Sequence, residues 1–159
     1  MLEDDVYIRE ARPEEAESLC DLAYLSRNYW DYPEEWVSYW FEEESFPITQ
    51  EYIEKNPTYL IENEEEEEIL GFYSLQKREG KWMLPHLWVI PEHIGDGYGG
   101  ALFLHACETA EALGAEFLFI ITDSNAEDFF CHMGAEKIEE RSHLVCGTEQ
   151  TFPVLRIRL

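Results

Sequence analysis

The stretch VIPEHIGDGYGGALFLHACETAEALG, residues 89–114, decides the fold of this protein. It links a strand-like run to a helix-like run through a loop in which Gly95, Gly97 and Gly100 have the spacing Gly-x-Gly-x-x-Gly. Loops with this spacing hold phosphate groups at the N-terminus of the following helix, where backbone N–H groups and the helix dipole attract an anion. Judged by its glycines alone, the loop is compatible with NAD, with S-adenosylmethionine, with coenzyme A or with no ligand.

The elements around the loop distinguish between these ligands. Changes in hydrophobic period predict, before the loop, a strand at 6–11, a helix at 12–27, a short helix within 28–46, a helical turn at 49–56 and strands at 58–63, 69–78 and 81–90. After the loop they predict a helix at 98–113, a strand at 116–122, a helix at 125–134 and two closing strands. A dinucleotide-binding domain carries its glycine loop in the first of its βαβ units, whereas a three-stranded meander precedes the loop here. This order argues against NAD and S-adenosylmethionine.

The same order predicts the fold class. We expect one α/β domain over residues 1–159, with a mixed, mostly antiparallel central sheet of about six to seven strands flanked by helices. The nearly all-apolar run at 116–122 is typical of a buried strand with a parallel neighbour.

The composition narrows the class of partner. The chain has 35 Asp and Glu against 11 Lys and Arg, a formal net charge of -24, which repels nucleic-acid phosphates and favours cationic partners. None of the four cysteines forms a C-x-x-C pair, so we expect no metal and a reducing compartment. No apolar run approaches the length of a membrane span, and the N-terminus lacks the pattern of a signal peptide. We therefore expect a cytoplasmic protein that binds neither nucleic acid nor membrane.

Two motifs, in this order of elements, resemble the GNAT superfamily of acyl-CoA-dependent N-acyltransferases. The run LWVIPEHIGDGYGGALF (87–103) is similar to the strand, proline and glycine loop of that family, and ITDSNAEDFFCHMGAEKI (121–138) is similar to its strand, Asn-Ala, aromatic pair and closing glycine. The resemblance covers essentially the whole chain. It implies the GNAT fold and acetyl-CoA as co-substrate, without a metal.

The resemblance also implies a set of coenzyme contacts. The fourth strand would separate from the fifth, so that its backbone pairs with the pantetheine arm and an N–H near Trp88 or Val89 polarises the thioester carbonyl. The coenzyme-binding residues expected from the two motifs are Leu87, Trp88, Val89, Ile94, Gly95, Asp96, Gly97, Tyr98, Gly99, Gly100, Asn125, Phe129 and Phe130.

The catalytic group expected from the sequence is His86. It lies on the strand before the loop, two residues from Trp88 and so on the same face of the strand. Histidine is the side chain best suited to take a proton near neutral pH. Three positions depart from the family pattern: Ile94 stands where a polar residue is frequent, Asp96 places a carboxylate inside the loop, and Phe130 stands where a tyrosine often serves as general acid.

The acceptor site is expected in the aromatic and acidic segment 28–46, with Trp30, Trp36 and Tyr39 as substrate-binding residues. Aromatic faces beside carboxylates suit an ammonium group.

The sequence thus predicts an N-acetyltransferase that transfers an acetyl group from acetyl-CoA to a primary amine of a small molecule, polyamine or peptide. The alternative is a degenerate GNAT domain that binds acyl-CoA or a protein partner without turnover. The closing strands make a homodimer an additional expectation.

Overall fold

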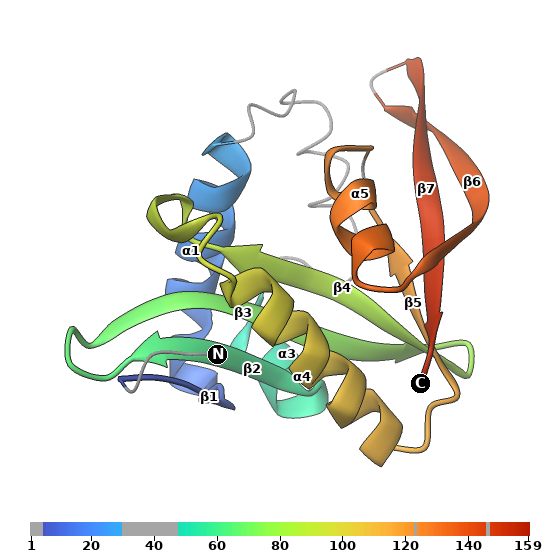
Figure 1. Ribbon diagram of the computed structural model, residues 1–159. Helices are drawn as coiled ribbons and strands as arrows, with labels where there is room; N and C mark the ends of the chain where they lie inside the picture. Colours follow the sequence, from blue (N-terminus) through green and yellow to red (C-terminus); the bar gives the residue numbers. More distant parts are fainter. Residues whose placement is uncertain (1–4, 30–47, 123, 146) are drawn as a thin grey trace.

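A seven-stranded sheet in the order β1-β2-β3-β4-β5-β7-β6 forms the centre of the molecule (Figure 1). This computed structural model describes residues 5–29, 48–122, 124–145 and 147–159. The strands are β1 (Val6–Glu10), β2 (Thr58–Asn63), β3 (Glu68–Arg78), β4 (Lys81–Val89), β5 (Phe117–Ile121), β6 (Glu136–Val145) and β7 (Thr148–Arg158). All neighbouring strands pair antiparallel except β4 and β5, which pair parallel. The predicted mixed, mostly antiparallel sheet is confirmed.

Helices cover both faces of this sheet. They are the 3-10 turns η1 (Pro13–Glu15) and η2 (Pro91–His93) and the α-helices α1 (Ala16–Tyr29), α3 (Gln50–Lys55), α4 (Tyr98–Ala112) and α5 (Ser124–His132). The short helix predicted within 28–46 lies largely outside the described residues. None of the described helices is long and apolar enough to cross a membrane.

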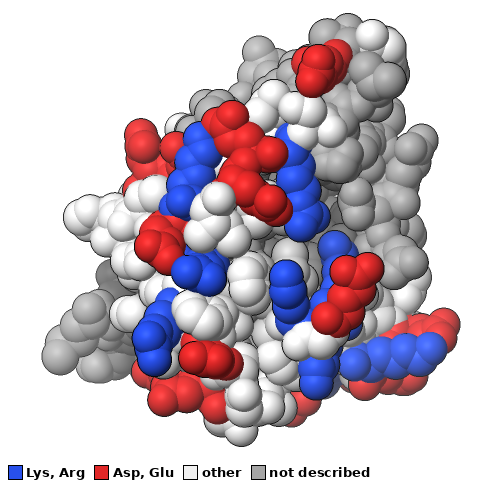
Figure 2. Space-filling model, turned by 90° about the vertical axis from the view of Figure 1, so that its right-hand side faces the viewer, with Lys and Arg blue, Asp and Glu red and all other residues white. Residues whose placement is uncertain are grey.

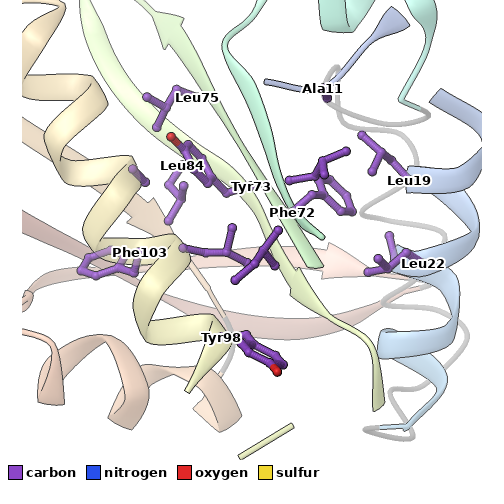
Figure 3. Close-up of a cluster of buried hydrophobic side chains, with 14 of the residues drawn as sticks. Ala11, Leu19, Leu22, Phe72, Tyr73, Leu75, Leu84, Tyr98 and Phe103 are labelled. Atoms are coloured by element: carbon purple, nitrogen blue, oxygen red, sulfur yellow. The ribbon is translucent and has the colours of Figure 1, made fainter. Parts of the chain in front are cut away.

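The core has two layers, one on each face of the sheet (Figure 3). Side chains alternate along a strand, so Phe72 of β3 packs toward Leu19 and Leu22 of α1, while its neighbour Tyr73 faces α4. Phe72, Tyr73 and Leu19 are all fully buried. Burial on both faces explains why the sequence of β3 contains a nearly continuous apolar run and does not alternate between apolar and polar residues.

Helix α4 is fixed to the sheet by small residues and a polar cluster. Ala106 and Ala110 are fully buried and let the helix approach closely. The Tyr73 hydroxyl lies 2.7 Å from His105 Nδ1 and 2.9 Å from Thr109 Oγ1, and Thr109 Oγ1 donates to the His105 carbonyl at 2.8 Å. Because the hydrogen of Thr109 is used there, the three bonds are all satisfied when His105 Nδ1–H donates to Tyr73 and Tyr73 donates to Thr109. Burial lowers the pKa of His105 and raises that of Tyr73.

A β-bulge bends β4 where it leaves β5. Between the pairs Ser74–His86 and Gln76–Met83, two residues of β4, Leu84 and Pro85, lie opposite one residue of β3. Bulges bend the strand that carries them. Proline has no N–H to donate to a neighbouring strand, and a bulge tolerates it because the ladder of hydrogen bonds is interrupted there. In the described strands, β4 pairs with β5 only at Trp82 and Met83. The bulge therefore separates β4 from β5 over the rest of its length, as the resemblance implied.

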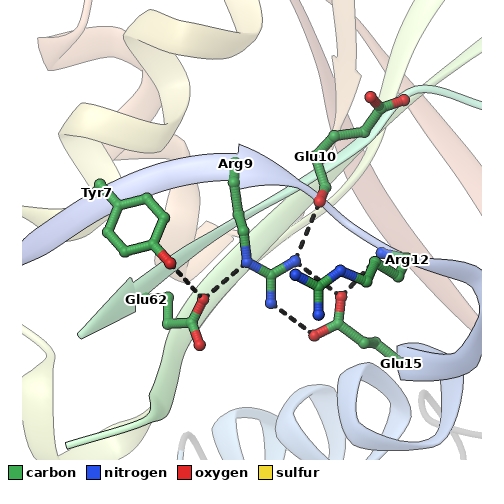
Figure 4. A network of polar contacts seen from close by, with 6 residues as sticks. All are labelled: Tyr7, Arg9, Glu10, Arg12, Glu15 and Glu62. Carbon is green, nitrogen blue, oxygen red and sulfur yellow. Dashed lines mark hydrogen bonds and ion pairs between the residues drawn. The ribbon is translucent and has the colours of Figure 1, made fainter. Parts of the chain in front are cut away.

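A polar network joins β1, η1 and β2 at the other edge of the sheet (Figure 4). Arg9 contacts Glu15 and Glu62, each at 2.7 Å, and its own side chain is only 17% exposed. Tyr7 donates to the same carboxylate of Glu62 at 3.1 Å. The hydrogen bond and charge of Arg9 hold the pKa of Glu15 below its usual value. The network thus closes the edge of the sheet with charges that are largely shielded from water.

We expect Arg9→Met to lower the free energy of unfolding by about 2 kcal/mol at pH 7, because two half-buried carboxylates lose their counter-charge. Since the folded pKa of Glu15 is depressed, the stabilisation is present above the unfolded pKa of glutamate and is lost as pH falls through the lower folded pKa. Urea unfolding should show a large difference between wild type and variant at pH 7, and the difference should shrink as the pH is lowered below the unfolded pKa of glutamate.

The matched control is Arg141→Met, which removes the pair between Arg141 and Glu139, whose side chains are 51% and 50% exposed. Exposed pairs contribute at most about 1 kcal/mol. Equal losses for Arg9→Met and Arg141→Met would contradict a special role for the Arg9 network.

Strands β6 and β7 differ in charge from the rest of the chain. They carry four basic residues (Lys137, Arg141, Arg156, Arg158) and four acidic ones (Glu136, Glu139, Glu140, Glu149), whereas the whole chain has a net charge of -24. Figure 2 shows this side of the molecule, with blue and red side chains interspersed. Lys137 pairs with Glu127 and Glu140, and Arg156 lies 3.0 Å from Glu136. The negative charge is therefore concentrated elsewhere.

Candidate functional site

The edge of β4 that faces β5 offers backbone groups for hydrogen bonding. Ile90 N–H donates to the Leu70 carbonyl at 2.9 Å, so the backbone groups of Ile90 point toward β3. Directions alternate along a strand, so the groups of Trp88 also point toward β3, and those of Leu87 and Val89 point the other way. In the described part of the chain no strand pairs with Leu87 or Val89 on that side. We call this the open edge of β4.

The alternation corrects one detail of the expected coenzyme contacts. The N–H near Trp88 or Val89 was expected to face the thioester, and the direction of the Ile90 bond shows that, of these two, only the Val89 N–H points toward the open edge. The Trp88 N–H is directed into the pairing with Phe72 of β3.

The glycine loop leads from the open edge into α4. Gly95 and Gly97 have φ angles of 97° and 88°, in the left-handed region that glycine adopts without strain. Gly97 is the N-cap of α4, so the first turn of the helix presents N–H groups that have no acceptor within the helix. Within the loop, the N–H groups of Ile94 and Asp96 are already used by the carbonyls of Pro91 and His93. The N–H groups of Ile94 and Asp96 are therefore not available to an anion, whereas those of the first turn of α4 have no acceptor within the helix.

Helix α5 covers the first turn of α4. A Cβ built on Gly99 would lie 3.6 Å from the Phe129 ring and 3.8 Å from Val89 Cγ2, and one on Gly100 would lie 3.8 Å from Met133. Phe129 thus lies beside Gly99, close to the side chain of Val89 on β4. Phe130, in contrast, is 6% exposed and packs against Phe103 at 5.5 Å between ring centroids. The structure places Phe130 in the core, and only Phe129 of the aromatic pair is adjacent to the loop.

Two polar side chains of the loop are hydrogen-bonded to each other. His93 Nδ1 lies 2.9 Å from Asp96 Oδ2, and the Asp96 side chain is 54% exposed. The His93 ring also contacts the ring of Tyr98, with centroids 5.6 Å apart. The carboxylate that the sequence places inside the loop is therefore hydrogen-bonded to a histidine three positions before it.

His86 is 6% exposed and faces the α1 and α3 side of the sheet. The Trp88 indole N–H donates to His86 Nδ1 at 3.0 Å. An indole nitrogen can only donate, so Nδ1 accepts, and the neutral ring carries its hydrogen on Nε2. Beside it, Tyr52 and Ser74 share a buried hydrogen bond of 2.8 Å, and burial raises the pKa of Tyr52. His86 therefore belongs to a buried polar group whose orientation is set by Trp88.

Some predicted residues cannot be placed in this site. Trp30, Trp36 and Tyr39 lie outside the described residues. Asn125 is the second residue of α5, next to the end of β5, and its side chain is also outside what the structure describes.

The structure adds one residue that the sequence argument missed. A Cβ on Gly71 of β3 would lie 2.6 Å from the Trp88 carbonyl oxygen and 3.3 Å from Val89 Cα, both backbone atoms. Gly71 is therefore the residue that allows β3 to approach β4 closely at Trp88 and Val89, on the edge of β4 opposite the open one. A glycine inside a strand pattern is a sequence signal for such an approach.

Solved structures resemble this chain over its whole length. A GCN5-related N-acetyltransferase from Rhodopseudomonas palustris is 19% identical with a TM-score of 0.77, over 100% of this chain and 99% of the other. The PaiA N-acetyltransferase from Thermoplasma acidophilum, solved with coenzyme A, is 18% identical with a TM-score of 0.75, over 97% and 99%. A GNAT family acetyltransferase from Elizabethkingia anophelis with bound acetyl-CoA is 17% identical with a TM-score of 0.65, over 99% and 100%. At these identities the likeness establishes the fold.

The family follows from the sequence match. A search of curated proteins finds none that matches. The family model described as "Acetyltransferase (GNAT) family" matches residues 22–134, which is more than half of the chain and includes β4, the glycine loop and α5. The chain belongs to the acetyltransferase (GNAT) family.

Proposed function

We propose that this protein transfers an acetyl group from acetyl-CoA to a primary amine. The observation that carries the proposal is the position of the open edge of β4 directly before the glycine-capped start of α4. An extended amide-containing arm can add to an open strand edge, and a diphosphate can bind at the start of a helix. Coenzyme A contains both groups joined in one molecule. Two similar structures were solved with coenzyme A or acetyl-CoA bound, which supports the proposal.

In the proposed complex the pyrophosphate accepts hydrogen bonds from the first turn of α4. The pantetheine amides pair with the backbone of Leu87 and Val89, and Phe129 packs beside the arm where it passes Gly99. The Val89 N–H then donates to the thioester carbonyl and stabilises the negative charge that develops on its oxygen.

The reaction is a direct transfer. The neutral amine nitrogen attacks the thioester carbonyl carbon, a C–N bond forms, and the C–S bond breaks. A base takes the proton that the nitrogen loses, and the departing thiolate takes a proton from water or from the exposed thiol of Cys131. Phe130 has no proton to give and is buried in the core.

His86 is the base that we propose. In the structure its Nδ1 lone pair is occupied by the Trp88 indole, so His86 can accept a proton only when that bond opens. Acceptor binding from the α1 and α3 side of the sheet is the event that would release it. This requirement makes Trp88 a natural probe of the mechanism.

The acceptor that we propose is cationic in its resting form: a small amine, a polyamine or a peptide amino group. The net charge of -24 attracts such molecules and repels phosphate-rich polymers. The carboxylates and the rings of Trp30, Trp36 and Tyr39 in the segment 28–46 supply suitable contacts for an ammonium group. We also propose that the protein is cytoplasmic. A homodimer, if one forms, would meet with least repulsion at the charge-balanced strands β6 and β7.

A second candidate function is coenzyme binding without turnover. It is favoured by two of the three departures from the family pattern: Asp96 brings a negative charge into the glycine loop, and Phe130 cannot serve as an acid. The resulting protein would hold acyl-CoA as a ligand or as a scaffold for another protein.

One experiment separates these functions. We expect acetyl-CoA at ten times its Kd to raise the melting temperature by several degrees, since a ligand bound only to the folded state stabilises it by about 1.4 kcal/mol at that concentration. Thiol release is then measured with a panel of monoamines, polyamines and N-terminal peptides. Stabilisation with thiol release on at least one amine supports the transferase. Stabilisation without release on any amine supports the binding protein, and no stabilisation at millimolar acetyl-CoA contradicts both.

A further inference from the structure

The pair of His93 and Asp96 lies in the glycine loop, and neither the reaction nor the fold accounts for it. Asp96 directly precedes Gly97, the N-cap of α4. A carboxylate near this position has two effects on an anion site. It repels the incoming phosphates, and it can itself accept hydrogen bonds from the N–H groups of the first helical turn, as acidic capping residues do. An unrestrained Asp96 would therefore compete with the ligand.

The structure shows how this competition is avoided. The Asp96 carboxylate is turned back along the loop to His93, 2.9 Å away. A carboxylate only accepts hydrogen bonds, so His93 Nδ1 carries the hydrogen and donates it, in the neutral and in the protonated ring alike. The bond therefore does not require a charged histidine.

His93 is itself held in place. Its side chain is 29% exposed, less than that of Asp96, and its ring contacts Tyr98, which is 7% exposed. Its backbone carbonyl accepts from the Asp96 N–H at 3.2 Å, which draws the two residues together. Ring contact and loop hydrogen bond thus fix the donor before the ligand arrives.

We propose that His93 is a positioning residue that keeps the Asp96 carboxylate away from the N–H groups at the start of α4, and that the pair sets the affinity of the loop for the coenzyme pyrophosphate. This inference rests on the proposed function, because it concerns the same site. It assigns His93 and Asp96 a role that depends on the pyrophosphate and not on the acetyl group or the amine.

A double-mutant cycle tests the proposal. His93→Phe keeps a ring against Tyr98 but removes the donor, and Asp96→Asn removes the charge but keeps the size. We expect His93→Phe to weaken acetyl-CoA binding and Asp96→Asn to tighten it, each on the order of fivefold at low salt, because one charge moves relative to a nearby dianion. The double variant should bind like Asp96→Asn, since His93 acts only through the carboxylate.

The control ligand is S-acetylpantetheine, which carries the thioester and both amides but no pyrophosphate. Wild type and the three variants are titrated with both ligands by calorimetry. For acetyl-CoA the affinities should differ as stated above, and for S-acetylpantetheine all four proteins should have equal affinities. Circular dichroism confirms that each variant is folded.

The outcomes separate this inference from the function on which it rests. If wild type binds no acetyl-CoA, the proposed function fails and this inference fails with it. If wild type binds and His93→Phe has unchanged affinity, or weakens binding equally with and without the carboxylate, the proposed function stands and the positioning role of His93 is overturned. Equal effects on S-acetylpantetheine would show a general distortion of the loop and would also overturn it.

Discussion

Replacing Gly71 by alanine is expected to damage both stability and coenzyme binding. The added Cβ would lie 2.6 Å from the Trp88 carbonyl oxygen, and a backbone atom cannot turn away as a side chain can. Separating the two strands there costs about 3 kcal/mol, which corresponds to a fall of roughly 6–12 °C in melting temperature for a domain of this size. Thermal unfolding followed by circular dichroism measures this change.

The same displacement would reach the proposed coenzyme site. Gly71 lies opposite Val89 in the β3–β4 register, so the strand that moves is the one with the open edge. Hydrogen bonds weaken steeply with distance and angle, and the loss of one well-aligned bond corresponds to about a tenfold rise in Kd. We expect acetyl-CoA affinity to fall by at least that factor when titrated at a temperature where the variant is folded.

Gly114→Ala is the matched control for Gly71→Ala. Gly114 ends α4 with a φ of 92° and has open space where a Cβ would stand. Alanine there strains the backbone and costs about 1 kcal/mol without touching β4. Loss of stability in both variants with loss of coenzyme affinity only in Gly71→Ala supports the argument. Unchanged affinity in Gly71→Ala would show that the open edge of β4 does not bind the coenzyme.

Replacing His86 by glutamine is expected to lower kcat by about 100-fold or more, which is the usual contribution of a general base. The glutamine amide oxygen can still accept the Trp88 indole hydrogen, so the buried hydrogen bond of 3.0 Å has a replacement and the fold should be retained. The loss should be in kcat, with little change in the KM for acetyl-CoA. In a plot of kcat against pH, the fall in rate at low pH that reports protonation of the base should disappear in this variant. Initial rates of thiol release across pH 5.5–9 provide both measurements.

Trp88→Phe provides the companion measurement, since it removes the indole donor and leaves Nδ1 of His86 available. If the Trp88 bond must open during each turnover, this variant should retain wild-type kcat or exceed it. Loss of activity equal to that of His86→Gln would mean that Trp88 holds His86 in its working position. Activity of His86→Gln within about threefold of wild type would instead make His86 a structural residue of the sheet, because a general base contributes far more than this.

Much of the fold could be predicted from the sequence, because the signals are local. Strands and helices follow from hydrophobic periods of a few residues, and the glycines at 95 and 97 directly predict a loop with positive φ angles. Pro85 within the strand 81–90 was also a readable signal of a bulge or strand edge. It correctly marks the place where β4 bends away from β5.

The site could be predicted only in outline. The motif locates the loop and the strand before it, but the assignment of backbone donors depends on which groups β3 already uses, and this selects Val89 over Trp88. Phe129 and Phe130 are neighbours in sequence and identical in type, yet one lies beside the loop and the other in the core. Helix rotation relative to the sheet makes that distinction, and it is set by packing across the whole molecule.

The sequence alone determined the order of elements, the glycine loop, the strongly acidic composition and the presence of a carboxylate in that loop. These are properties of local patterns and of composition, and they suffice to place the chain in its family. Only the tertiary structure decided that Asp96 is held by His93, that Trp88 occupies Nδ1 of His86, and that Gly71 allows β3 to approach β4 closely. The physical reason is that these relations are fixed by rotamers, strand register and the approach of separate strands, which arise only when the core packs around them.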